Sequence, residues 1–231
     1  MSNDVYGPAM TLAPPLSGPS AVRVRTLREA AAAFVRHGSP WALLAAAVVA
    51  AAALVAVGGW RWTQLAVVAA VVLAQPFVEW VVHVVVLHAR PRRLGPVTLD
   101  LYQARKHREH HASPRDLDIL LIPLRGHVAG GVLTGLVCLL LPDAQTRLAL
   151  VLSAAVGSLV YEWVHFLIHT DYKPRGAAYR RLYVHHRLHH YRNENHWFGV
   201  SRRLGDRVLG TAPRKDEVPL SPTCLDLSAR T

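Results

Sequence analysis

The sequence predicts an all-α integral-membrane protein, a four-helix transmembrane bundle with a cytoplasmic histidine-rich helical cap. Three observations support this prediction. Hydrophobic residues make up 52% of the 231 residues, and they collect in long runs of Ala, Val and Leu. Ten of the fourteen histidines fall into four compact clusters beside these runs. The chain is basic, with a formal net charge of +11, and its Lys and Arg residues flank the apolar runs.

Composition also limits the class of protein. A basic chain is compatible with nucleic-acid binding, but basic residues beside apolar runs favour a membrane, so we expect no nucleic-acid partner. The two cysteines, Cys138 and Cys224, form no C-x-x-C motif, so neither a zinc ribbon nor a disulfide framework is indicated. The first twenty residues lack a basic segment followed by an apolar core, so no cleavable secretory signal is expected.

The N-terminal part divides into two segments. Met1–Ser20 is rich in proline and cannot bury much surface, which predicts a disordered tail. Val22–Arg36 alternates arginines with apolar residues. It predicts either a short amphipathic helix at a membrane surface or a solvated helix that leads into the first span.

Four apolar runs follow. About 20 apolar residues in a helix span the roughly 30 Å hydrocarbon layer of a bilayer. The candidate spans are Trp41–Val57, Leu65–Leu87, Val128–Leu141 and Leu148–Ile168. The third run has only fourteen residues, so it spans only if it is tilted or extended by its neighbours. Residues 89–127 are polar, and we expect them outside the bilayer. For residues 173–203 the sequence predicts a helix pair or a helix followed by a loop. The tail from Thr211 contains Pro213, Pro219 and Pro222 and is predicted to be extended or disordered.

Charge placement predicts the orientation. With four spans, both termini and the 89–127 loop share one side of the membrane. All Lys and Arg residues lie on that side except Arg61 and Arg147. The positive-inside rule therefore places the termini in the cytoplasm, and all four histidine clusters fall on the same side. We expect the plasma membrane of a bacterium, with a cytoplasmic active site.

The histidine spacing predicts a metal site. An H-x-x-H-H motif occurs twice, and positions i, i+3 and i+4 of a helix share one face. Two further pairs have spacings of five and four residues. The ten candidate ligands are His83, His88, His107, His110, His111, His165, His169, His186, His189 and His190. Ten imidazoles are too many for one zinc-type site, so two metal ions with up to five nitrogens each are predicted. Imidazole suits Zn, Cu, Fe and Ni alike.

One pair fits this scheme least well. His83 and His88 are five residues apart, which leaves them roughly 140° out of alignment on a straight α-helix. Both histidines can reach metal only under one of two conditions. Either the end of the helix unwinds, or two metal ions lie between them. Of the remaining histidines, His37 and His127 stand alone and are left out of the ligand set, and His185 and His196 receive no role.

Two glutamates are predicted to support the ligands. Glu79 lies four residues before His83, and Glu162 lies three residues before His165. A carboxylate there can accept the second N–H of a ligating imidazole and fix its orientation. The alternative is an ion pair on a helix surface, which is less favourable within a membrane run.

In this order the motifs resemble the fatty acid hydroxylase superfamily, integral-membrane di-iron oxygenases that include sterol desaturases. The resemblance covers roughly Val78–Ala212. The H-x-x-x-x-H spacing and the closing segments Asn193–Val200 and Asp206–Thr211 are more similar to fatty acid 2-hydroxylases than to sterol desaturases. Carotenoid hydroxylases share much of the histidine pattern.

The resemblance implies a membrane di-iron hydroxylase domain at 41–212, an N-terminal tail and amphipathic segment at 1–40 and a C-terminal tail at 213–231. It implies two iron ions held by the ten histidines, which zinc could replace in purified protein. The implied reaction is hydroxylation of a lipid or fatty-acyl C–H bond with O2 and an external electron donor. A lipid, sterol or carotenoid desaturase or hydroxylase of the superfamily is the alternative. A metal transporter is a distant alternative. Transporters hold their ligands near the bilayer midplane, whereas the histidines of this chain gather at one face of the membrane.

Overall fold

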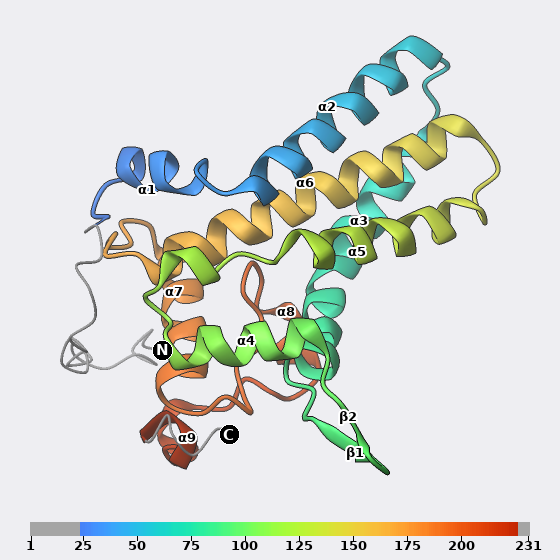
Figure 1. Ribbon diagram of the computed structural model, residues 1–231. Coiled ribbons are helices and arrows are strands. Elements are labelled where there is room, and N and C mark those ends of the chain that lie inside the picture. Colours follow the sequence, from blue (N-terminus) through green and yellow to red (C-terminus); the bar gives the residue numbers. More distant parts are fainter. Residues whose placement is uncertain (1–23, 226–231) are drawn as a thin grey trace.

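The computed structural model describes residues 24–225, whose regular secondary structure is helical apart from one hairpin (Figure 1). In chain order the elements are α1 (Leu27–Phe34), α2 (Gly38–Val57), α3 (Trp62–Val81), η1 (Val82–Leu87), β1 (Arg92–Leu94), β2 (Val97–Leu99), α4 (Tyr102–Ala112), η2 (Leu117–Ile119), α5 (Leu124–Cys138), α6 (Ala144–His169), α7 (Ala177–Tyr191), α8 (Leu204–Val208), η3 (Lys215–Glu217) and α9 (Pro222–Leu225). Strands β1 and β2 pair antiparallel, with Arg93 opposite Thr98. The predicted tail Met1–Ser20 lies outside the described residues.

Four segments are long and apolar enough to cross a membrane: Gly38–Val57, Trp62–Leu87, Leu117–Cys138 and Ala144–His169. The predicted four-helix membrane fold is therefore confirmed. Helix α5 begins four residues before the predicted third run, so its N-terminal neighbours do extend it. The outer faces of these helices carry large apolar side chains, which are the surface that lipid requires.

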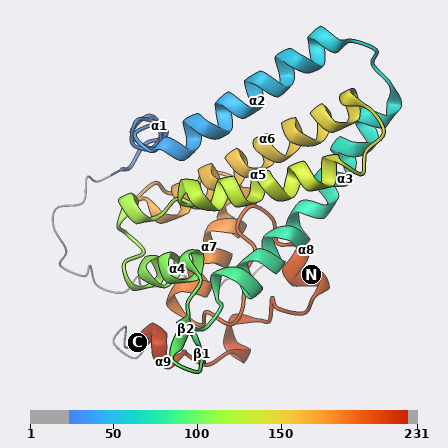
Figure 2. The same ribbon diagram turned by 45° about the vertical axis from the view of Figure 1, so that its right-hand side comes forward.

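Helix α6 is the central element of the bundle. It contacts α1, α2, α3 and α5 on its sides and α7 at the end that carries the histidines. Figures 1 and 2 show α4, α7, α8 and the hairpin gathered below one end of the bundle. The turns between α2 and α3 and between α5 and α6 lie at the opposite end. The predicted helical cap is thus present at a single end of the four long helices.

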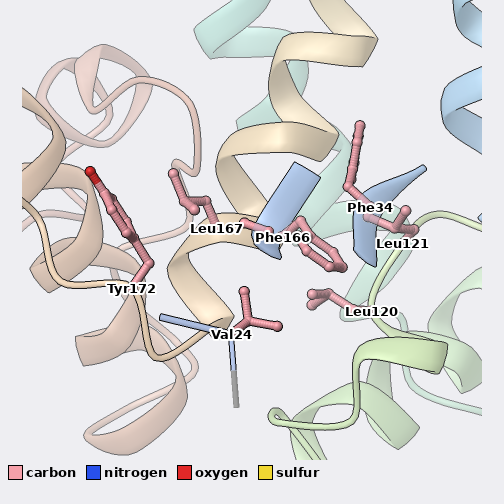
Figure 3. Close-up of a cluster of buried hydrophobic side chains, with 8 residues drawn as sticks. Val24, Phe34, Leu120, Leu121, Phe166, Leu167 and Tyr172 are labelled. Atoms are coloured by element: carbon pink, nitrogen blue, oxygen red, sulfur yellow. The ribbon is translucent and has the colours of Figure 1, made fainter. Parts of the chain in front are cut away.

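Helix α1 is attached to the cap end of α6. Thr26 begins it, since its hydroxyl accepts from the backbone N–H of Glu29 at 3.2 Å while the Glu29 carboxylate reaches back. Phe34 packs edge-on against Phe166 of α6, with ring centroids 5.4 Å apart. Figure 3 shows the apolar cluster that forms there, which also contains Leu167. We call it the α1–α6 cluster.

The predicted extended or disordered tail from Thr211 is not what the structure shows up to residue 225. Val218 is buried against Leu188 and Trp197, and the backbone N–H of Ser221 donates to the carbonyl of Arg192 at 2.8 Å. These partners lie well before the tail in sequence. The local proline content therefore gave no sign of the packing that orders it.

Candidate metal centre

The ten predicted ligands come together in the cap as two adjacent groups of five. The first group contains His83, His88, His107, His111 and His189. The second group contains His110, His165, His169, His186 and His190. In each group one ring nitrogen from every histidine lies within 4.8 Å of all the others. Nine of the ten side chains are buried, and His88 is half-buried.

The nitrogen spacing in the first group fits a metal ion better than a hydrogen-bond network. Nε2 of His107 lies 3.1 Å from Nε2 of His83, 3.2 Å from that of His88 and 3.0 Å from that of His111. A neutral imidazole nitrogen has either one proton or one lone pair, so it cannot bond to three other nitrogens. Nitrogens at right angles around an ion, each about 2.1 Å from it, would be about 3.0 Å apart.

The second group repeats this arrangement. Nε2 of His186 lies 3.1 Å from Nε2 of both His169 and His190. Nε2 of His165 is buried in the same group and has no hydrogen-bond partner. A buried nitrogen without a partner is costly, and a metal ion would accept its lone pair. The donor set of both groups therefore fits bound metal ions.

Each H-x-x-H-H motif divides its histidines between the two groups. On α4, His107 and His111 join the first group and His110 joins the second. On α7 the reverse holds, since His189 alone joins the first group. Positions i and i+4 therefore lie in one group and position i+3 in the other. The three imidazoles of a motif were predicted to converge on one site. In the structure two of them lie in one group of histidines and the third lies in the other group.

The pair that spacing supported least is brought together by a π-helical turn. At η1 the backbone N–H of His88 donates to the carbonyl of His83 at 3.0 Å, a five-residue step. The wider turn places positions i and i+5 above one another, so both imidazoles reach the first group. Single π-helical turns are rare and often occur at functional sites.

Two ligands are oriented by backbone carbonyls. Nδ1–H of His83 donates to the carbonyl of Phe198 at 2.6 Å, and Nδ1–H of His189 donates to that of His196 at 2.8 Å. These bonds leave the Nε2 lone pairs directed at the first group. The residue between the two carbonyls, Trp197, is buried with φ of 58°, which is uncommon for a bulky side chain. Backbone strain of this kind concentrates at functional sites.

Asp206 holds this loop in place. Its buried carboxylate accepts from the backbone N–H groups of Phe198 at 2.9 Å and Gly199 at 2.6 Å. It also accepts from the Thr211 hydroxyl at 2.6 Å and from Nε2–H of His185 at 2.8 Å. Burial alone would raise the pKa of Asp206, but these hydrogen bonds hold it below its ordinary value. Asp206 and His185 were missed in the sequence, because a single acidic residue after the last cluster carries no spacing signal.

The predicted role of Glu79 is not what the structure shows. Its carboxylate accepts from the Ser201 hydroxyl, from the Ser201 backbone N–H at 3.1 Å and from the Gln75 amide at 3.3 Å. Nδ1–H of His83 already donates its hydrogen bond to the carbonyl of Phe198. Glu79 therefore anchors the loop that supplies that carbonyl, and does not contact the ligand itself.

Glu162 also differs from its prediction. It accepts from Nε2–H of His127 at 2.7 Å and from the Ser39 hydroxyl at 2.9 Å, in place of the expected bond from His165. The carboxylate turns away from the metal centre because α2 and α5 supply donors on that side. His127, which was left out because it stands alone in the sequence, is therefore part of a buried contact that joins three helices.

Burial favours the neutral form of five of the cap histidines. Burial, and after it the neighbouring imidazoles, lower the pKa of His107, His111, His186 and His190 well below the usual value of 6.5. Burial likewise lowers the pKa of His189. A neutral imidazole presents the lone pair that a metal needs.

A membrane helix bundle whose cap carries two groups of five imidazoles, nine of them buried, fits the class of membrane metalloproteins. The fatty acid hydroxylase family matches residues 67–211, which include all ten candidate ligands. The chain belongs to this family.

Relatives of known identity are similar over the same region. Fatty acid 2-hydroxylase from Macaca fascicularis is 26% identical over 135 residues, and that from Homo sapiens is 25% identical over 135 residues. Each match covers 58% of this chain and 36% of the relative, so the match spans about a third of these curated relatives. Dihydroceramide fatty acyl 2-hydroxylase FAH2 from Arabidopsis thaliana is 25% identical over 147 residues, 64% of this chain and 60% of the relative.

The fold is similar to that of a solved structure. Full-length scs7p, of which only the hydroxylase domain is visible, has a TM-score of 0.63 and 24% sequence identity. The alignment covers 79% of this chain and 68% of that one. This likeness supports the arrangement of bundle and cap.

Proposed function

We propose that this protein is a membrane-bound di-iron oxygenase that hydroxylates a C–H bond of a lipid or fatty-acyl chain, with O2 as co-substrate and an external electron donor. The observation that carries the proposal is the convergence of five imidazole nitrogens in each of two adjacent groups. The names of the curated relatives, fatty acid 2-hydroxylases, support the reaction and the substrate class. Imidazole donors fit iron, although they would also bind zinc.

The two irons would supply the redox chemistry that no side chain of this protein can perform. The first group of histidines would hold one ion and the second group the other. The loop of Trp197 and Asp206 keeps two imidazoles of the first group oriented, so that little rearrangement is needed on metal binding. Burial of nine ligands excludes water from the centre, which protects a reactive site from side reactions.

We further propose that the cap faces the cytoplasm at a bacterial plasma membrane. The arginines and lysines at the histidine-bearing end support this orientation, since only Arg61 and Arg147 among those of residues 24–225 lie at the other end of the bundle. An electron donor from the cytoplasm would then reach the metal centre directly.

The test is metal content combined with lipid analysis. Protein purified without oxygen and loaded with iron should contain two metal ions per chain. Lipid extracts of a host that expresses it should gain species with one added oxygen atom, measured by mass spectrometry. Loss of two hydrogen atoms would indicate a desaturase instead. A zinc-loaded preparation is the control and should be inactive, because zinc has no redox chemistry.

Two results would contradict the proposal. One is a metal-to-protein ratio near one that reconstitution does not raise. The other is an unchanged lipid profile from protein that is fully loaded with iron and supplied with reductant and O2.

A further inference from the structure

Helix α3 lacks one of its own hydrogen bonds within a membrane span. Pro76 lies inside α3, and proline has no backbone N–H. The carbonyl four residues earlier, on Val72, therefore cannot receive its usual helical donor. Val72 and its neighbours Val68 and Leu73 are exposed apolar residues, and they belong to the lipid-facing surface of the span. Water is scarce there, so a carbonyl without a donor is costly and needs a partner from elsewhere in the protein.

Arg202 supplies the missing donor. Its side chain comes from the loop before α8, and its Nη1 atom donates to the Val72 carbonyl at 2.7 Å. The two residues are 130 positions apart in the sequence. Charged side chains beside lipid commonly pair with backbone carbonyls. The contact therefore stabilises both partners, because the carbonyl gains a donor and the guanidinium group gains an acceptor.

Two further contacts hold the same part of the chain against α3. Gly205 of α8 packs so closely that a Cβ atom there would collide with the Pro76 carbonyl and lie 3.2 Å from Cβ of Trp80. The indole N–H of Trp80 donates to the Thr211 hydroxyl at 2.9 Å. Figure 1 shows α8 beside α3. The segment that carries Arg202 is therefore packed on the part of α3 in which the proline lies.

The backbone of Arg202 contacts the segment that orients a candidate ligand. Its carbonyl lies so close to Gly199 that a Cβ atom on Gly199 would collide with it. Gly199 follows Phe198, and the Phe198 carbonyl accepts from Nδ1–H of His83 at 2.6 Å. A displacement of Arg202 would therefore move the carbonyl that orients His83.

We propose that Arg202 is a positioning residue for the first group of histidines. It binds the α3 carbonyl that Pro76 deprives of its helical donor, and it thereby fixes the loop that orients His83. Both orienting carbonyls of this loop, those of Phe198 and His196, serve the first group. The second group is therefore expected to bind metal independently of Arg202. The proposal concerns metal binding and does not depend on the proposed reaction.

The experiment titrates the metal-free full chain in neutral detergent with zinc ions against a chromophoric chelator, which gives an affinity for each site. Arg202→Met removes the donor and keeps an unbranched side chain. It should lower the affinity of one site about 10–100-fold, as is usual when groups that orient ligands are lost, and leave the other site unchanged. Arg202→Lys can still donate to the carbonyl and should retain most of the affinity. Arg207→Met is the matched control, because Arg207 is exposed on α8, and both affinities should equal those of the wild type.

A double-mutant cycle with Pro76→Ala tests the part played by the proline. Alanine restores a backbone N–H at position 76, so the Val72 carbonyl regains its helical donor and Arg202 loses its acceptor. In this background Arg202→Met should change the affinity of the affected site by no more than about twofold. If Arg202→Met alone does not fold, the double variant should fold, because its carbonyl is satisfied. It should then show one weakened site and one site like that of the wild type.

Unchanged zinc affinities in Arg202→Met would overturn the proposal. So would an equal loss at both sites, because the substitution would then act on the fold as a whole. An equal loss with proline and with alanine at position 76 would show that Arg202 does not act through the Val72 carbonyl, and a double variant that fails to fold would show the same. Binding is measured without turnover, so these results are independent of whether the protein oxidises lipid.

Discussion

At the scale of single residues, the candidate ligands could be named from the sequence, whereas the contacts that orient them could not. Histidine spacing is a local property, so the ten residues could be named before their positions were known. The groups that orient His83 and His189 are backbone carbonyls, which have no side-chain signature. Glu79 and Glu162 have suitable helical spacing, but their donors Ser201 and Ser39 lie more than a hundred residues away. Helix periodicity cannot reveal such partners.

His189→Ala tests the ligand assignment directly. The change removes one nitrogen from the first group and leaves the second group complete, so bound metal should fall from about two ions per chain toward one. Lipid oxidation should be lost, while membrane insertion is kept because the four spans are untouched. Elemental analysis and oxidised lipid per inserted protein are the measurements.

His37→Ala is the matched control for this variant. His37 belongs to neither group and lies against Phe166, with ring centroids 5.8 Å apart. Metal content and activity should therefore stay near those of the wild type. Normal metal content in His189→Ala together with metal loss in His37→Ala would refute the assignment.

At the scale of elements, the long helices followed from the sequence because length and hydropathy are local properties. The π-helical turn at η1 did not, since a run of valines gives no signal for a five-residue step. The division of each H-x-x-H-H motif between two ions also required the packing of α4 against the ends of α6 and α7. The tail after Thr211 was misjudged for the same reason, because its order comes from long-range contacts.

Gly199→Ala tests the loop that orients two ligands. A Cβ atom at Gly199 would collide with the carbonyl of Arg202 and lie 2.8 Å from the Asp206 carboxylate, so the loop must move. Displacement of the Phe198 and His196 carbonyls should lower metal affinity about 10–100-fold, as is usual when the groups that orient ligands are lost. Metal competition titration measures this.

Gly130→Ala is the control for the loop variant. Gly130 lies within α5, and a Cβ atom there would meet nothing within 4 Å. Alanine in a helix interior is favoured over glycine by up to about 1 kcal/mol, so stability should hold or rise slightly and metal affinity should not change. Equal metal affinities in the two variants would contradict the role given to the loop.

His127→Ala tests the contact that joins three helices. Ser39 of α2, His127 of α5 and Glu162 of α6 meet at a carboxylate that is almost fully buried. Removing the imidazole leaves one carboxylate oxygen without its donor, which should cost about 1–3 kcal/mol of unfolding free energy. The near-neutral effect expected from an isolated histidine is therefore replaced by a destabilisation, with metal content unchanged. Unfolding in detergent is the measurement.

Thr134→Ala is the control for that variant. The Thr134 hydroxyl donates only within α5, to the carbonyl of Gly130 at 2.9 Å, and is exposed. Its loss should change the unfolding free energy by less than about 0.5 kcal/mol. If both variants unfolded alike, the buried contact would contribute nothing to helix association.

At the scale of the whole molecule, the buried histidines make stability depend on pH. Burial lowers the pKa of the cap histidines of both groups, whereas the same residues in an unfolded chain titrate near 6.5. Below about pH 6.5 the unfolded chain therefore binds protons that the folded chain does not. The stability contribution is complete above that pH and is lost as pH falls, by about 1.4 kcal/mol per pH unit for each histidine.

The expected result is a Tm of the metal-free chain that is flat above about pH 7.5 and falls steeply below about pH 6. Bound metal should raise Tm and should be released over the same acidic range, because protons compete for the same lone pairs. Thermal unfolding in detergent across this range, with metal release measured in parallel, provides the test. A Tm that rises on acidification would show that the cap histidines are not held neutral.

The distribution of charge predicts which side of the membrane the metal centre faces. The two inter-helix turns at the end of the bundle away from the cap carry only Arg61 and Arg147, whereas every other Lys and Arg between residues 24 and 225 belongs to a segment at the cap end. An even number of spans keeps the two ends of the described chain on the side of the cap, and the positive-inside rule predicts that this side is cytoplasmic. A reporter active only outside the cytoplasm should give signal when fused after Thr63 or Asp143. It should give none after Pro114 or at the C-terminus.

The fusion after Pro114 tests the side of the metal centre most directly, because Pro114 lies two residues beyond α4, the helix that supplies histidines to both groups. An external signal there would place the metal centre outside and remove direct access for a cytoplasmic electron donor.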